Sequence, residues 1–200
     1  MMEISFLAAL AVFAATMTGT PGPNNMMLTA SGANFGYKRT IPHLIGISLG
    51  VATLIAFVAA GLGVIFKMYP WIQETMKVVA SGYLVYLAWR IVKAGAPDAS
   101  QREGRRPMTM LEGAMFQFIN PKAWAMAVSA VGTFTLSGGD YWWSAAVIVM
   151  TFIAVGFPLT SLWAGFGVWV GKVLSTESSW KAFNRTMGAL TASCLVFIWL

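Results

Sequence analysis

The sequence predicts an all-α membrane protein whose six transmembrane helices form two inverted three-helix halves, with helices 1 and 4 broken near the midplane. Of the 200 residues, 58% are hydrophobic and only 10% are charged, whereas about a quarter are charged in a soluble domain. Basic residues gather in alternate connections between apolar segments, and prolines interrupt two segments at corresponding places. The lipid bilayer is therefore the expected environment.

Six apolar segments are each long enough to cross about 30 Å of hydrocarbon at about 1.5 Å per residue. In chain order they cover residues 4–35, 40–66, 76–92, 108–136, 142–170 and 180–200. The first is too long for one straight crossing, and its prolines mark where it bends or unwinds. Because no basic n-region precedes it, we expect a retained span rather than a cleaved signal peptide.

The charges of the connections predict the orientation in the membrane. The connections after the first, third and fifth segments hold Lys38, Arg39, Arg90, Lys93, Arg102, Arg105, Arg106, Lys172, Lys181 and Arg185. The opposite side holds only Lys67 and Lys77. By the positive-inside rule, the basic connections are cytoplasmic and both termini lie outside a bacterial inner membrane. This topology explains the net charge of +6 without a nucleic-acid partner.

The sequence predicts one transmembrane transporter domain over residues 1–200. Residues 1–94 form the first three-helix half, residues 95–107 form a polar cytoplasmic linker, and residues 108–200 form the second half. Because three spans are an odd number, the second half enters the membrane from the opposite side. Any similarity between the halves is therefore an inverted repeat, which is typical of transporters with a site near the midplane.

The first helix break contains Pro21, Gly22 and Pro23. Proline lacks an amide donor and disfavours helix at the preceding residue, so the break frees backbone groups that cannot face hydrocarbon. Asn24 and Asn25 follow, where the next helix starts with unpaired amides. We expect both asparagines to bind substrate through these polar groups. The alternative is helix capping by Asn24 without a ligand.

The second break is predicted at Asn120, Pro121 and Lys122, about halfway along the fourth segment. A charge in the membrane centre costs about 2.5–3.5 kcal/mol on insertion scales, so we expect Lys122 to face away from lipid. Asn120 and Lys122 are therefore expected to bind an anionic or zwitterionic substrate. The alternative for Lys122 is snorkelling or pairing with a carbonyl that Pro121 frees. Gln117, five residues earlier, is expected to face elsewhere.

His43 and Glu112 are candidates for a proton pathway, because both lie near the predicted cytoplasmic ends of spans. The alternative for His43 is an interfacial polar residue, and for Glu112 an ion pair with a loop arginine. Small-residue pairs let helices approach closely. These pairs are Gly32/Gly36, Gly46/Gly50 and Gly167/Gly171. Packing inside the bundle is the preferred interpretation, and a homodimer stays open.

The remaining chemistry-bearing residues are few. Cys194 is the only cysteine, so a disulfide, a CxxC motif and a metal-thiolate cluster are excluded. One cysteine and one histidine supply no convincing nucleophile and base, so we expect no enzyme, cofactor or metal site. A metal-ion exporter would need clustered His, Asp or Glu, and the linker has only Asp98 and Glu103. A purely structural membrane protein would leave two midplane breaks unexplained.

Several motifs, in their order and spacing, resemble the LysE/RhtB family of amino-acid exporters. They are Pro21-Gly22-Pro23-Asn24-Asn25, Gly36-Tyr37-Lys38-Arg39, Gly46 and Gly50, Gly82-Tyr83-Leu84-Val85-Tyr86-Leu87-Ala88-Trp89, Asn120-Pro121-Lys122 and Asn184-Arg185-Thr186-Met187-Gly188. The resemblance covers nearly the whole chain and includes the basic linker. It implies a six-helix inner-membrane carrier that exports a small-molecule substrate, an amino acid or a close derivative, using the proton gradient.

Many members of that family carry Asp where this chain has Asn24 or Asn25. The uncharged pair suggests a neutral or zwitterionic substrate, and this form of the motif looks most like the branch that exports cysteine and O-acetylserine. We expect alternating access by rocking of one half against the other. The alternatives are an exporter of another small metabolite or of a metal ion, and a membrane protein that transports nothing.

Overall fold

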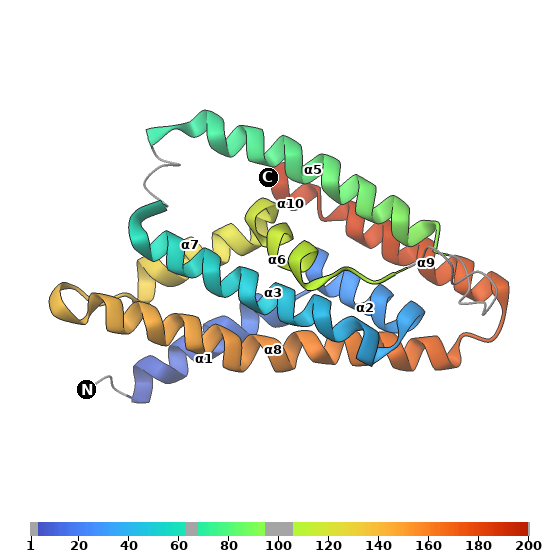
Figure 1. Cartoon of the computed structure of the whole chain (residues 1–200), viewed down its shortest axis with the longest axis horizontal. Coiled ribbons are helices and arrows are strands. Elements are labelled where there is room, and N and C mark those ends of the chain that lie inside the picture. Colours follow the sequence, from blue (N-terminus) through green and yellow to red (C-terminus); the bar gives the residue numbers. More distant parts are fainter. Residues whose placement is uncertain (1–3, 63–67, 95–105, 200) are drawn as a thin grey trace.

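A computed structural model describes residues 4–62, 68–94 and 106–199, and every element in those ranges is helical (Figure 1). Lys67, Arg102 and Arg105 of the charge count, and most of the 95–107 linker, lie outside the described residues. Helix α5 (Pro70–Val92) packs along α9 (Glu177–Ser193) at one edge of the molecule. The all-helical prediction is confirmed for the described part of the chain.

The first apolar segment is broken at the predicted place. Helix α1 (Ile4–Gly19) and helix α2 (Pro23–Phe35) meet at a bend of 60°. Pro23 occupies the first turn of α2, where its missing amide costs nothing and its fixed φ favours helix. The segment thus stops and restarts as the proline chemistry requires.

Helix α3 (Tyr37–Phe57) follows α2 after one residue, Gly36, whose φ of 81° favours glycine. Its last turn widens into the π-helical segment η1 (Val58–Leu62). The predicted end of this span at residue 66 lies outside the described residues. Helix α5 begins at Pro70, six residues before the predicted start at Met76.

The fourth apolar segment forms α6 (Met110–Ile119) and α7 (Pro121–Phe134), with a single residue between them. The short 3-10 helix η3 (Gly138–Asp140) then leads into α8 (Tyr141–Val173), which continues through its internal proline. The helix of the last apolar segment, α9, starts at Glu177, three residues earlier than predicted. It ends at Ser193, before the short helix α10 (Val196–Trp199). This third interruption, at Cys194 and Leu195, was not predicted from the sequence.

Three membrane crossings are supported by helix length and composition within the described residues. The helical stretches Tyr37–Leu62 and Gly138–Val173 are each long and apolar enough, and the bent pair α1 and α2 makes a third candidate. The other predicted spans fall on α5, on α6 with α7, and on α9 with α10, which do not meet the same criterion. The apolar helices are those of a membrane protein, and six crossings stay a prediction.

The helices of the two sequence halves pack against one another. Helices α1 and α2 pack on α8, while α6 and α7 pack on α3, and α3 also contacts α8. Glycines bring some of these backbones together: a Cβ added at Gly32 would overlap the Ala164 carbonyl oxygen, and one added at Gly46 would overlap that of Met110. These glycines therefore serve packing inside the bundle, as expected.

The buried apolar side chains form two clusters rather than one. The larger cluster gathers side chains of α1, α2, α3, α7 and α8, including Leu10, Leu44 and Ile148. The smaller cluster lies between α5, α2 and α6, with Leu84 and Phe116 completely buried, and includes Cys194 just after α9. The smaller cluster thus joins α5 to α2 and α6 beside the main core.

Candidate functional site at the two helix breaks

The two helix breaks meet through Lys122. Its Nζ donates to the Thr20 carbonyl oxygen at 2.9 Å, to Thr20 Oγ1 at 2.8 Å and to the Pro21 carbonyl oxygen at 3.3 Å. An ammonium has three donors, so these acceptors satisfy it. The Lys122 stem also lies against Gly22, where an added Cβ would be 3.0 Å from Cδ. The cation therefore binds carbonyls that the first break frees, rather than one freed by Pro121.

Two other side chains complete the hydrogen bonding of the first break. Asn25 is 3% exposed, and its Nδ2 donates to the carbonyl oxygens of Thr18 at 2.9 Å and Thr20 at 2.8 Å. The Trp163 indole of α8 donates to the Gly19 carbonyl oxygen at 3.2 Å. Although Thr20 is exposed, its carbonyl is thus covered by polar partners, which is what a break in apolar surroundings requires.

Asn24 pairs with Gln117 through a reciprocal amide contact. Asn24 Nδ2 donates to Gln117 Oε1 at 2.9 Å, and Gln117 Nε2 donates back to Asn24 Oδ1 at 3.1 Å. Gln117 is completely buried and also donates to the Gly113 carbonyl at 2.8 Å. The alternative of capping by Asn24 is wrong, because residue 22 is the N-cap of α2 and its start has no side-chain cap.

The expectation for Gln117 was also wrong. The prediction that Gln117 faces away from Lys122 holds only for one continuous helix. In the structure α6 ends at Ile119 and the chain turns at Asn120. The turn brings Gln117 beside the break, where Asn120 Nδ2 also donates to its Oε1 at 3.4 Å. An amide within an apolar run, three residues before an Asn-Pro pair, was the sequence pattern that could have identified it.

The second break is closed by nearby residues of its own segment. Asn120 is 2% exposed, and its Oδ1 accepts from the Lys122 backbone amide at 3.1 Å, so Asn120 caps α7. The Trp124 indole donates to the Phe118 carbonyl oxygen at 2.7 Å. This break therefore needs no partner from the first half of the chain.

All four predicted substrate-binding residues line one small cavity of about 40 Å³, namely Asn24, Asn25, Asn120 and Lys122. Such a volume holds a water molecule or two and no larger ligand. The geometry supplies one ammonium, several carbonyl oxygens and three amide side chains in a single place. It is chemically suited to a small molecule with both a carboxylate and an ammonium.

A larger cavity of about 390 Å³ lies between α2, α3, α5 and the segment that precedes α6. His43 lines it and is 1% exposed, with neither ring nitrogen hydrogen-bonded. The interfacial alternative for His43 is therefore wrong. A Cβ added at Gly113 would lie 3.0 Å from the His43 ring. Helix α6 therefore packs over the imidazole at Gly113, where α6 has no side chain.

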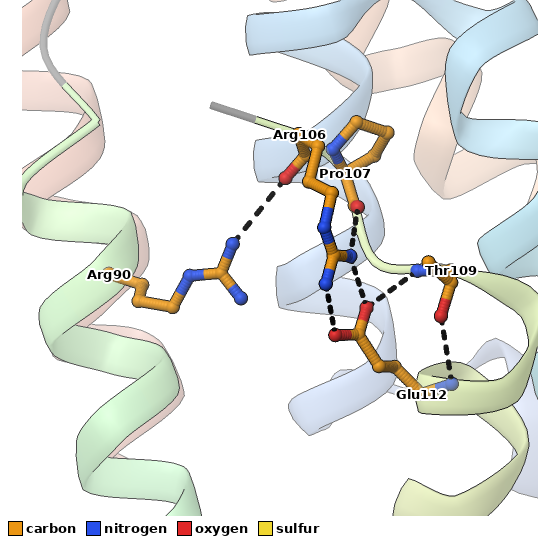
Figure 2. Close-up of polar contacts among 5 residues, drawn as sticks. All are labelled: Arg90, Arg106, Pro107, Thr109 and Glu112. Carbon is orange, nitrogen blue, oxygen red and sulfur yellow. Dashed lines mark hydrogen bonds and ion pairs between the residues drawn. The ribbon is translucent and has the colours of Figure 1, made fainter. Parts of the chain in front are cut away.

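Glu112 forms an ion pair with Arg106, which confirms the alternative of a pair with a loop arginine (Figure 2). Its two carboxylate oxygens accept from Arg106 Nη1 at 2.6 Å and Nη2 at 2.7 Å, and its Oε2 also accepts from the Thr109 amide at 2.8 Å. The hydrogen bond to the carboxylate raises the pKa of Arg106, which keeps its charge. On the far side, Arg90 makes a long contact of 3.5 Å to the Arg106 carbonyl.

The described residues hold no group of three His, Cys, Asp or Glu side chains arranged to bind a metal ion. The apolar helices, together with two proline breaks joined by polar contacts, define the class of a membrane protein with an interrupted helical core. The chain belongs to the LysE type translocator family, whose pattern matches residues 15–197. The resemblance stated from the motifs is thereby confirmed, and the family is one of transporters.

Curated relatives share part of the chain. Over 120 residues it is 33% identical to the cysteine/O-acetylserine efflux protein of Salmonella choleraesuis, covering 58% of this chain and 59% of the relative. Over 138 residues it is 30% identical to the protein of that name in Escherichia coli, covering 68% of each. The chain thus spans 59% of the length of the Salmonella relatives that it matches. No solved structure matches the chain.

Proposed function

We propose that this protein is a secondary transporter that exports a small neutral or zwitterionic amino acid, or a close derivative, across the bacterial inner membrane. The names of the relatives make cysteine and O-acetylserine the first candidate substrates. The observation that carries the proposal is the contact between the breaks, in which Lys122 binds the carbonyls of Thr20 and Pro21.

A zwitterionic substrate would replace this contact group by group. Its carboxylate would take the Lys122 ammonium, and its ammonium would take the released carbonyls of Thr20 and Pro21. Asn24, Asn25 and Asn120 line the same cavity and supply amides at its walls. Because each broken hydrogen bond has a replacement, binding leaves no buried group unpaired.

The proposed topology has six crossings in two inverted halves, with both termini outside and the 95–107 linker cytoplasmic. The packing supports it, because the broken helix of each half lies on the second helix of the other half. That exchange is what a two-fold axis in the membrane plane produces. The distribution of basic residues supports the orientation.

The moving parts that we propose differ from the two sequence halves. Glycine contacts tie α2 to α8 and α3 to α6, so rocking of one half against the other would separate closely packed backbones. Helix α5 packs mainly on α9 and makes few contacts with α2 and α6, through the smaller apolar cluster. Movement of the α5–α9 pair against the remaining helices would open and close the larger cavity, which α5 lines.

We further propose that the proton gradient drives export, with His43 and Glu112 as the candidate titratable groups on the cytoplasmic side. His43 is buried without a hydrogen-bond partner, so a change in its charge would strongly affect its surroundings. Glu112 is held by Arg106, which favours a structural role unless that ion pair opens during transport.

The experiment that tests the function is efflux from proteoliposomes loaded with labelled amino acids, including O-acetylserine and cysteine, with and without a proton gradient. Parental protein should release one or a few of them, and Lys122→Ala and Asn24→Ala proteins should not. Lys181→Ala is the matched control, because Lys181 is exposed and pairs with Glu177 on the same helix. Equal efflux from parental and Lys122→Ala proteins, both shown to be folded, would refute the site, and absence of any efflux would favour another metabolite or a metal ion.

A further inference from the structure

The larger cavity is a candidate binding site that differs from the site at the breaks. Its volume of about 390 Å³ falls within the range of ligand pockets, about 300–1,000 Å³, whereas the cavity at the breaks holds about 40 Å³. The parts of the chain that line it include the last turns of α2 and α5, near the basic connections. The cavity is therefore on the side proposed as cytoplasmic.

The charges around the cavity favour an anionic group. Arg90, Lys93 and Arg106 line it, and Glu112 neutralises Arg106 through the bidentate ion pair of Figure 2. Within the described ranges, neither Arg90 nor Lys93 forms an ion pair with a carboxylate. Instead, Arg90 lies over the Tyr86 ring and Lys93 over the Trp89 ring. Two cations are thus available to a carboxylate, and arginine binds one with particular geometric fit.

The inner wall of the cavity holds polar groups, one of them without a partner. Both His43 ring nitrogens are buried without a hydrogen bond, and Gly113 of α6 covers the ring, so the imidazole lies just behind this wall. Ser31 and Asn34 of α2 also line the cavity and offer oxygens that accept from an ammonium. The wall therefore suits the two ends of a zwitterion.

One face of α2 connects the two cavities. Asn24 lines the small cavity, while Met27, Ser31 and Asn34 line the large one. These positions follow each other at spacings of three or four residues, so they share one face of the helix. A molecule in the large cavity would lie along the same face that leads to the breaks.

We propose that the large cavity is a cytoplasmic entry site for a small zwitterionic amino acid, whose carboxylate binds Arg90 while its other end faces the Ser31–His43 wall. This inference rests on the proposed function for its choice of ligand. The entry site holds the substrate when the site at the breaks is closed around Lys122. Movement of the α5–α9 pair would then pass the molecule along α2.

The test is equilibrium binding of labelled O-acetyl-L-serine to the purified full chain in nanodiscs, together with efflux of the same compound. Arg90→Gln should weaken binding by about tenfold or more, because it removes the charge that pairs with the carboxylate. Lys172→Gln is the matched control: it removes one cation from an exposed position outside the cavity and should leave affinity unchanged. The methyl ester of O-acetylserine, which has no carboxylate, should not compete.

A second measurement locates the ligand. In a Cys194→Ser background, an Ala30→Cys protein carries a thiol in the cavity wall, and O-acetylserine should slow its labelling by a maleimide. Lys122→Gln should abolish export and keep this protection, because Lys122 lies outside the large cavity. Protection lost in Lys122→Gln but kept in Arg90→Gln would place the ligand at the breaks and overturn the entry site.

The two readouts separate the inference from the proposed function. Export of O-acetylserine without saturable binding to the cavity would overturn the entry site and leave the transporter intact. Binding that depends on Arg90, without export of this compound or any other amino acid, would support the cavity site and count against the proposed function. Absence of both would overturn both.

Discussion

The two helix breaks differ in length and in the source of their hydrogen-bond partners. Three residues separate α1 from α2, whereas only Asn120 separates α6 from α7. The first break takes its partners from three different helices: Asn25 of α2, Trp163 of α8 and Lys122 of α7. The second break takes its partners from its own segment, through the Asn120 cap and the Trp124 indole.

The comparison indicates that the two breaks have different tasks. A break that is satisfied locally can keep its shape when neighbouring helices move, since none of its bonds must open. A break that is satisfied from elsewhere changes whenever one of its partners leaves. We therefore expect the second break to act as a rigid carrier of Lys122 and the first break to be the part that opens for substrate.

The largest expected effect follows removal of the Lys122 ammonium. Lys122→Met keeps an unbranched apolar chain but removes the donor to the Pro21 carbonyl and one of the two side-chain donors to the Thr20 carbonyl. The free energy of unfolding in detergent should fall by about 2 kcal/mol, and export should be lost. Lys122→Arg is the control that keeps the charge. Unchanged stability with lost export would mean that Lys122 acts on substrate alone.

A smaller difference separates the asparagines of the two breaks. Asn25→Ala removes hydrogen bonds to two carbonyls of the first break, those of Thr18 and Thr20, and should lower the free energy of unfolding by about 2 kcal/mol, although Lys122 still donates to Thr20. Asn120→Ala removes a helix cap, for which about 1 kcal/mol is typical. Unfolding in detergent, followed by tryptophan fluorescence, measures both. A larger loss for Asn120→Ala would reverse the proposed roles of the breaks.

The positions of both breaks could be predicted from the sequence because they depend on local chemistry. Proline removes an amide donor whatever surrounds it, so Pro23 and Pro121 mark helix starts in the structure as in the sequence. The all-helical fold and the family followed from composition and motifs for similar reasons. Even the bundle packing of Gly32 was accessible from residue spacing alone.

The partners of the breaks could not be predicted, since they come from distant parts of the chain. The acceptors of Lys122 lie about a hundred positions earlier in the sequence, at separations of 101 and 102. Gln117 was misjudged because helical spacing was carried across a turn. The burial of His43 depends on Gly113 of another helix, and no periodicity within α3 reveals it.

The reciprocal amide pair between the breaks gives a sharper test of function against stability. Gln117→Leu alone leaves the Asn24 amide without its partner, and Asn24→Leu alone removes two of the hydrogen bonds of Gln117, so each should cost about 1 kcal/mol of unfolding free energy. The double leucine variant removes both amides and should recover most of that loss. Export should nevertheless stay low in all three proteins if these amides bind substrate. Recovery of export together with stability would make the pair purely structural.

The smallest expected effects come from the two indoles, and they should differ in kind. Trp163→Phe and Trp124→Phe each keep an aromatic ring and remove one N–H donor, at bond lengths of 3.2 Å and 2.7 Å. Each should cost about 0.6–1 kcal/mol of unfolding free energy, with the shorter Trp124 bond at the upper end. Export should fall more in Trp163→Phe than in Trp124→Phe. Trp163 reaches the first break from α8, whereas Trp124 binds within its own segment. Efflux rates and unfolding curves for the two variants measure both orders. If Trp124→Phe reduced export more than Trp163→Phe, the second break would have to move during transport, and the assignment of the first break as the part that opens would be wrong.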